Sequence, residues 1–260
     1  MLEAHGIRVA LGRREILHSV DLRAAPGALS CIVGPNGSGK TTLLRALTGD
    51  ARHDGTVSIN GRDTARLRAW ELAALRGVLP QAATLAFPFT VTEVVRIGLR
   101  AGDAGEHAEI AAAALGRVGL AGYAERSYQE LSGGEQQRVQ LARVLAQVWE
   151  PVTEDGPRWL FLDEPVSSLD IGHQIEVMQV ARDFADAGGG VIAVMHDLNL
   201  SAMFGDRMLC LSEGRIIAEG APGEVMTDAT LSRAYRCRVR VNAVPGEAAS
   251  FILPHMAQAD

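Results

Sequence analysis

Apolar and polar residues alternate near the start of the chain. The alternation runs through residues 7–9 and 16–17, and turn-forming residues (Ala-Pro-Gly) follow at 25–27. Successive side chains of a strand point to opposite faces, so such alternation is typical of strands with one buried face. We therefore predict an antiparallel β edge over residues 1–30.

Three later stretches are short and almost entirely apolar: residues 29–33, 159–162 and 191–195. Strands that are buried on both faces have this composition. Helical spacing of apolar residues follows the first stretch at 41–47 and separates the other two at 171–187. This order of strands and helices predicts an α/β fold, in which helices cover a parallel sheet.

The section between the first two of these strands has a different composition. Ala, Leu, Arg and Glu are frequent in residues 66–122, and we expect this section to be helical. Apolar residues recur at helical spacing in residues 91–99, 110–118 and 133–149. We expect a helical subdomain inserted at about residues 82–150.

Two shorter segments lie outside these helices. Residues 150–157 are hydrophilic and contain two prolines and a glycine, so we expect a loop there. Residues 239–241 have strand character, and the remainder of the C-terminal tail shows no clear pattern.

Composition and charge limit the function classes. Of the 260 residues, 47% are hydrophobic and 22% are charged, which is typical of a globular protein. The 25 basic and 31 acidic side chains give a net charge of -6, which argues against binding nucleic acid through net charge. The chain does not open like a secretory signal, and no apolar run approaches the ~18 to 20 residues that a membrane span needs. We expect synthesis to end in the cytoplasm and any membrane role to be peripheral.

The strongest local motif follows the first buried strand. It fits G-x-x-x-x-G-K-[ST] in full and lies between a predicted strand and a predicted helix, as a phosphate-binding loop requires. Its glycines allow backbone N–H groups to turn towards phosphate oxygens, Lys40 reaches the β and γ phosphates, and the Thr41 hydroxyl can bind Mg²⁺. The candidate nucleotide-binding residues are Gly34, Pro35, Asn36, Gly37, Ser38, Gly39, Lys40, Thr41 and Thr42.

Two acids end the second buried strand, directly after residues 160–162. An acid at the C-terminal end of a sheet strand can hold Mg²⁺ through water in a nucleotide hydrolase, and Asp163 has this position. Glu164, one residue further, is placed to act as the general base that accepts a proton from the attacking water.

A second glycine motif starts the helix at residue 133. Ser132, Gly133 and Gly134 leave the first-turn N–H groups open, so they can form a second anion cradle, although a plain Ser-capped helix has the same pattern. With the other motifs, the sequence resembles the ATP-binding subunits of ABC transporters. Their signature is LSGGQ, and Glu135 replaces the last Gln here. The resemblance covers nearly all of residues 1–230.

The resemblance implies further roles. Gln81 matches the Q-loop residue, which acts in catalysis and binds Mg²⁺; Asp170 lies in the D-loop, and His196 matches the switch histidine. The implied cofactors are ATP and Mg²⁺. Leu11 stands where the family usually stacks an aromatic ring on adenine. The implied fold is a P-loop NTPase core with an antiparallel β edge and the helical insertion, forming an ABC ATPase domain over 1–236 and a C-terminal extension over 237–260.

Lys40 and Ser132 are 92 positions apart, on two different helix starts. One chain is therefore not expected to bring both cradles onto one γ-phosphate. The family solution is a head-to-tail homodimer with ATP at the interface.

A closer resemblance is to the importer subunits for haem, siderophores and vitamin B12. It rests on residues 87–95, 196–200 and 220–225, and the loop at 150–157 is similar to that of the haem branch. This implies the ATPase motor of a bacterial haem importer, on the cytoplasmic face of the inner membrane. The implied partners are two polytopic permease subunits and, through them, a periplasmic haem-binding protein.

Other cargoes and other classes stay open at this point. Siderophore or vitamin B12 import fits the same motifs. A soluble ABC ATPase acting on nucleic acid or the ribosome would share them too, but such proteins usually carry two nucleotide domains or long coiled coils. The chain has neither and shows no basic patch, so we expect no nucleic-acid partner. Glu164 and His196 argue against a regulator that binds nucleotide without hydrolysis.

Overall fold

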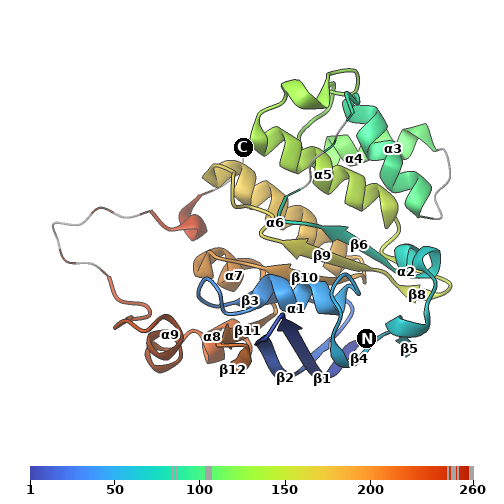
Figure 1. Ribbon diagram of the computed structural model, residues 1–260. Helices are drawn as coiled ribbons and strands as arrows, with labels where there is room; N and C mark the ends of the chain where they lie inside the picture. The colour runs from blue at the N-terminus through green and yellow to red at the C-terminus, as the bar shows by residue number, and fades with distance from the viewer. Residues whose placement is uncertain are drawn as a thin grey trace.

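A six-stranded sheet forms the centre of the computed structural model (Figure 1). Its strand order is β12 (Arg215–Gly220), β11 (Arg207–Ser212), β3 (Leu29–Val33), β10 (Gly190–Val194), β9 (Trp159–Asp163) and β6 (Arg76–Leu79). All neighbours pair in parallel except β12, which is antiparallel to β11. The structure describes residues 1–82, 85, 87–102, 107–244, 246, 250 and 252–257.

A second, antiparallel sheet lies below the central one in Figure 1. Its order is β2 (Arg14–Ala24), β1 (Leu2–Leu11), β4 (Asp54–Ile59) and β5 (Arg62–Asp63). The inward residues of β1, such as Leu2, Ala4 and Ile7, are fully buried. The antiparallel β edge predicted for residues 1–30 is confirmed.

The central strands divide the core into two clusters, one on each face of the sheet. Because successive side chains alternate, Cys31 and Leu162 lie in one cluster while Ile32 and Phe161 lie in the other. The first cluster includes residues of α5 (Gly133–Gln147), α6 (Ile171–Asp186) and α7 (Leu198–Phe204). The second includes α1 (Lys40–Leu47) and the antiparallel sheet. Burial on both faces explains the continuous apolar runs, and the α/β prediction is confirmed.

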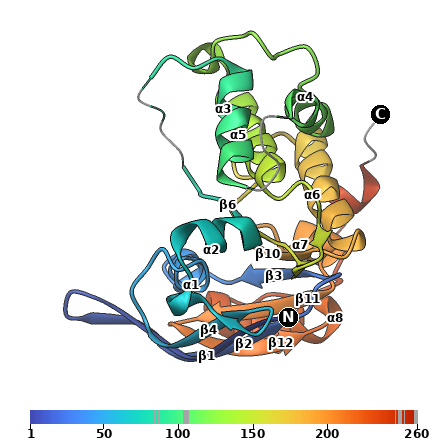
Figure 2. The same ribbon diagram turned by 90° about the vertical axis from the view of Figure 1, so that its right-hand side faces the viewer.

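The helical insertion lies at the top of Figures 1 and 2, above β6 and β9. It contains α3 (Val91–Ala101), α4 (Ala108–Arg117) and the start of α5. The remaining helices are α2 (Ala69–Leu75), α8 (Pro222–Val225) and α9 (Asp228–Tyr235), with 3₁₀ turns at Thr64–Arg66, Tyr128–Glu130 and Pro254–Met256. Among the described residues, none of the helices combines the length and the apolar character needed to cross a membrane.

Three sequence predictions need correction. Residues 66–122 are not helical throughout, because β6 pairs with β9 inside them; Gly77 in β6 fits closely against Val144 of α5. The segment 150–157 contains a small hairpin of β7 (Val152–Thr153) and β8 (Gly156–Pro157). Residues 239–241 form no strand; instead the backbone N–H of Val239 donates to Ser232 Oγ at 3.0 Å.

The contact between α3 and α5 yields a stability prediction. A Cβ on Gly98 of α3 would lie 1.9 Å from the carbonyl oxygen of Arg143, so Gly98→Ala must force the two helices apart. We expect a loss of about 1–3 kcal/mol in the free energy of unfolding, measured by urea titration.

Gly116→Ala is the matched control, because this helical glycine of α4 has no atom within 4 Å of the added Cβ. It should leave stability unchanged or raise it by up to about 1 kcal/mol. Equal effects of the two substitutions would contradict the close packing of α3 on α5.

Candidate functional site

The predicted phosphate loop turns sharply between β3 and α1. Gly34, Gly37 and Gly39 have φ values of 146°, 75° and 105°, a region that favours glycine. A Cβ on Gly34 would lie 2.0 Å from the carbonyl oxygen of Leu211 in β11, so no other residue fits there. Helix α1 begins at Lys40, one residue before the predicted helix, and its first N–H groups face the loop.

Lys40 is held inside this loop and is only 5% exposed. Its Nζ donates to the carbonyl oxygens of Gly34 at 2.9 Å and Pro35 at 3.2 Å. Burial lowers the pKa of the ammonium group, while the charges of Glu164 and Asp163 raise it. An anion bound in the loop would add a further opposite charge beside this buried ammonium group.

Asp163 ends β9 beside the first turn of α1. The Thr41 hydroxyl donates to Asp163 Oδ1 at 3.1 Å, and Asp163 is 4% exposed. Burial raises the pKa of this carboxyl group, and the hydrogen bond from Thr41 lowers it. A hydroxyl and a carboxylate at this spacing form a partial set of the oxygen ligands that Mg²⁺ prefers.

Glu164 is the centre of a three-residue network. His196 Nε2 lies 2.5 Å from Glu164 Oε1, and Gln81 Nε2 donates to Glu164 Oε2 at 2.9 Å. The backbone of Glu164 has a φ of 53° and is held by Gln137, whose Nε2 donates to the Glu164 carbonyl oxygen at 3.0 Å. Both carboxylate oxygens therefore have fixed partners, and the three predicted catalytic side chains meet at one point.

These groups share one cleft of about 540 Å³. Asn36, Gly37, Gly39, Lys40, Thr41, Thr42, Gln81, Glu164 and His196 line it, as predicted. Leu11, Arg14 and Ile16 of the β1–β2 hairpin complete the lining. The remaining loop residues Pro35 and Ser38 line a neighbouring cavity, and Asp163 lines a third, together with Thr41 and Gln81.

Three residues near the site were not identified from the sequence. Arg14 and Ile16 follow Leu11 on the same hairpin, and only the pairing of β1 with β2 brings them to the cleft. Gln137 lies two residues beyond the signature motif, which ends at Glu135. That spacing is the one sequence signal that could have identified it, since a single turn of α5 carries both.

The second predicted cradle lies away from this cleft. Ser132 caps α5: its hydroxyl and its backbone N–H donate to Glu135 Oε2 at 2.7 and 2.8 Å. Hydrogen bonds from Ser132 lower the pKa of Glu135. Asp170 caps α6 and accepts from the backbone N–H of His173 at 3.0 Å. In the described parts of the chain, the lining of the Lys40 cleft does not include Ser132, Gly133, Gly134 or Asp170.

Residues 17–167, more than half of the chain, match the family model described as ABC transporter. The chain belongs to the ABC transporter family. As an ATP-binding cassette of this family, it is 62% identical over 256 residues to the hemin import ATP-binding protein HmuV of Roseobacter denitrificans, with 98% of each chain covered. It is 60% identical over 258 residues to HmuV of a Jannaschia species, covering 99% of this chain and 96% of that one.

Solved cassettes have the same fold. The dimeric structure of a bacterial ABC transporter cassette matches with a TM-score of 0.75 and 26% identity, covering 85% of this chain and 99% of that one. A dimeric cassette in a post-hydrolysis state, bound to ADP and Pi, matches with a TM-score of 0.74 and 25% identity, over 85% of this chain and 99% of that one. The predicted family and fold class are confirmed.

The network around Glu164 yields a kinetic prediction. Glu164→Gln keeps the shape of the side chain and removes the proton acceptor, so ATP turnover should fall by about 10²- to 10⁴-fold while ATP binding persists. Phosphate release and nucleotide binding by the purified chain measure the two properties. Glu125→Gln, at an exposed position outside the cleft, is the control and should turn over ATP at the parent rate. Parent-like turnover by Glu164→Gln would place the base elsewhere.

Proposed function

We propose that this cassette is the ATP-hydrolysing motor subunit of a bacterial ABC importer that powers haem (hemin) uptake across the inner membrane. The observation that carries the proposal is the convergence of Lys40, Glu164 and His196 in one cleft. The cargo is supported by similarity to hemin import proteins over nearly the full length.

The cleft supplies the groups that phosphoryl transfer to water needs. Lys40 and the loop N–H groups offset charge on the β and γ phosphates. Glu164 accepts a proton as the water oxygen bonds to the γ phosphorus. The bond from that phosphorus to the bridging oxygen breaks, and ADP and phosphate are released. His196 and Gln81 fix the carboxylate of Glu164, so the base is oriented before the reaction starts.

The residues beside the loop fit Mg²⁺. Thr41 and Asp163 present oxygen atoms 3.1 Å apart, and Gln81 lines the same cavity. In our proposal Thr41 and Gln81 bind the ion directly and Asp163 binds through water. When bound, Mg²⁺ neutralises charge on the β and γ phosphate oxygens.

The proposed active unit is a head-to-tail homodimer. Ser132 and Asp170 start helices whose ends lie outside the Lys40 cleft of their own chain. A second chain related by two-fold symmetry would place its Ser132 loop over the nucleotide bound at Lys40, giving two ATP molecules at the interface. A related cassette of known structure is a dimer, which supports this arrangement.

A mixing experiment tests the composite site. Lys40→Ala and Ser132→Arg should each abolish hydrolysis alone, because each destroys one half of both sites. Mixed together, they form heterodimers with one intact site, and about a quarter of the parent ATPase rate should return at equal concentrations. A mixture as inactive as its components, under conditions where heterodimers form, would contradict the composite site.

We also propose where this motor works. It is peripheral on the cytoplasmic face of the inner membrane, bound to two polytopic permease subunits that receive haem from a periplasmic haem-binding protein. It has no nucleic-acid partner.

The proposed domain organisation has two parts. Residues 1–236 form the ABC ATPase domain, with the helical subdomain inserted at about 82–150, and residues 237–260 form an extension.

The proposed contact with the permease follows Gln81. Residues 83, 84 and 86 of this segment lie outside the described residues, whereas Phe87 is described and 68% exposed. Its ring meets that of Phe89 edge to face, with centroids 6.2 Å apart, and Phe89 packs against the core. Phe87 is therefore the residue of this pair that a cytoplasmic permease helix can cover.

Phe87→Asp tests the permease contact without touching the cleft. We expect unchanged basal ATPase, reduced co-purification with the permease, and loss of growth on haem under iron limitation. Val244→Asp, at a position of the extension that is 81% exposed, is the control and should grow normally. Normal haem uptake by Phe87→Asp would disprove the contact. Stimulation of the assembled complex by a siderophore- or B12-loaded binding protein, and not by a haem-loaded one, would disprove the cargo.

A further inference from the structure

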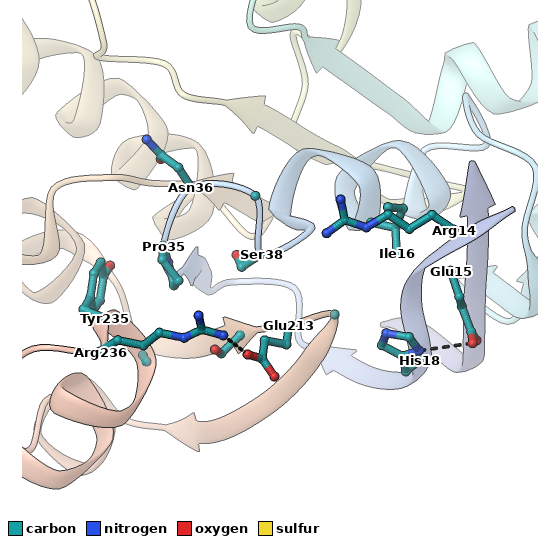
Figure 3. A pocket seen from close by; sticks show the side chains of 14 residues that line it. Arg14, Glu15, Ile16, His18, Pro35, Asn36, Ser38, Glu213, Tyr235 and Arg236 are labelled. Atoms are coloured by element: carbon teal, nitrogen blue, oxygen red, sulfur yellow. Dashed lines mark hydrogen bonds and ion pairs between the residues drawn. The ribbon is translucent and has the colours of Figure 1, made fainter. Parts of the chain in front are cut away.

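The phosphate loop is bordered on its far side by a second cavity of about 550 Å³ (Figure 3). The loop residues Pro35 and Ser38 form one wall of this cavity. The β11–β12 turn and the end of α9 form a second wall, and residues between Arg14 and His18 of β2 form a third. Across this open space, Pro35 and Ser38 face the β11–β12 turn and the end of α9.

The first contact with the phosphate loop comes from the β11–β12 turn. The backbone N–H of Gly214 donates to the carbonyl oxygen of Ser38 at 3.0 Å, and the backbone N–H of His18 donates to the Gly214 carbonyl oxygen at 3.0 Å. A Cβ on Gly214 would lie 2.0 Å from the Ile16 carbonyl oxygen, so the turn is pressed against β2. The position of Ser38 therefore depends on the position of this turn.

The β11–β12 turn is also tied to the end of α9. Glu213 and Gly214 both have left-handed backbones, with φ of 48° and 70°, as a two-residue hairpin turn requires. The carboxylate of Glu213 pairs with the guanidinium of Arg236, which follows α9 and is itself left-handed, with φ of 54°. Figure 3 shows this pair spanning the gap between the two elements. This ion pair thus joins two residues whose backbones have the left-handed conformation, which glutamate and arginine rarely adopt.

Tyr235 provides the second contact from α9. Its ring lies beside Pro35 in Figure 3. Burial raises the pKa of its hydroxyl group, and the backbone of Gly34 lowers it. Gly34 is the residue already pressed against Leu211. The chain beyond Arg236 folds back on α9, where the N–H of Val241 donates to Asp228 Oδ1 at 2.8 Å. The start of α9 is therefore held by the chain that follows the helix, and its end by Tyr235 and Arg236.

We propose that Tyr235 and the Arg236–Glu213 pair are positioning residues that set the shape of the phosphate loop, and hence its affinity for nucleotide phosphates. The proposal rests on the proposed function, since it takes ATP to bind in this loop. The loop binds phosphate through backbone N–H groups, whose directions follow from where Gly34 and Ser38 are held. The C-terminal helix is then a support for the nucleotide site, although no residue of α9 lines the Lys40 cleft.

Conservative variants of the full-length chain test this support. Tyr235→Phe removes the hydroxyl and keeps the ring; Glu213→Gln and Arg236→Gln remove the ion pair. Tyr235→Phe should weaken binding of ATP by about three- to ten-fold. The ion-pair variants should weaken it by about two- to five-fold, because both side chains of that pair are exposed. Binding of inorganic tripolyphosphate should weaken equally, because the loop contacts phosphates and not the base. Combining Glu213→Gln with Arg236→Gln should weaken ATP binding no further than either substitution alone, because both break the same interaction.

The control is Glu219→Gln, which breaks the less exposed pair with Arg207 on the same hairpin, away from the phosphate loop, and should leave ATP affinity unchanged. A purely structural role would lower the thermal midpoint of the variants and leave their ATP and tripolyphosphate affinities at the parent value while they are folded. That result would overturn the proposal. A parent chain that bound no ATP would overturn the proposed function and this support with it, so the two failures are distinguishable.

Discussion

The turn from β3 into α1 is the constraint on which the functional parts depend. Within six residues the chain leaves a buried strand, turns through three glycines with positive φ and begins a helix. It does so between the carbonyl oxygen of Leu211 and the side chain of Leu17, which lie 2.0 and 2.9 Å from where Cβ atoms of Gly34 and Gly39 would be. Close packing and backbone shape therefore require the same glycines, and the loop that results buries Lys40 at the start of α1.

The parallel sheet explains why distant residues meet at this turn. The carboxyl ends of β3, β9, β10 and β6 lie at one edge, so the residues that follow them are neighbours in space. Asp163 ends β9, and Gln81 and His196 lie two residues beyond their strands. Glu164 receives hydrogen bonds from residues that follow β6 and β10 and from α5, and these contacts fix its orientation.

The two helix starts that are predicted to bind anions differ in structure. The first turn of α1 carries the buried Lys40, whereas the first turn of α5 is closed by the hydrogen bonds between Ser132 and Glu135. A carboxylate at that position places negative charge beside the second cradle, and an incoming phosphate competes with it for the Ser132 hydroxyl. This difference is consistent with the proposed dimer, in which the Lys40 loop binds nucleotide and the Ser132 loop completes the nucleotide site of a second chain.

The sequence by itself determined the elements whose pattern is local. Apolar runs identified β3, β9 and β10, the glycine motif identified the phosphate loop, and adjacent acids identified Asp163 and Glu164. It did not reveal β6, because four residues that continue directly from α2 carry neither a turn signal nor a long apolar run. Only the tertiary structure decided that Gln137 holds Glu164 and that Arg236 pairs with Glu213. Such contacts join polar side chains on separate elements, and their pairing is set by how the sheets and helices pack rather than by any pattern along the chain.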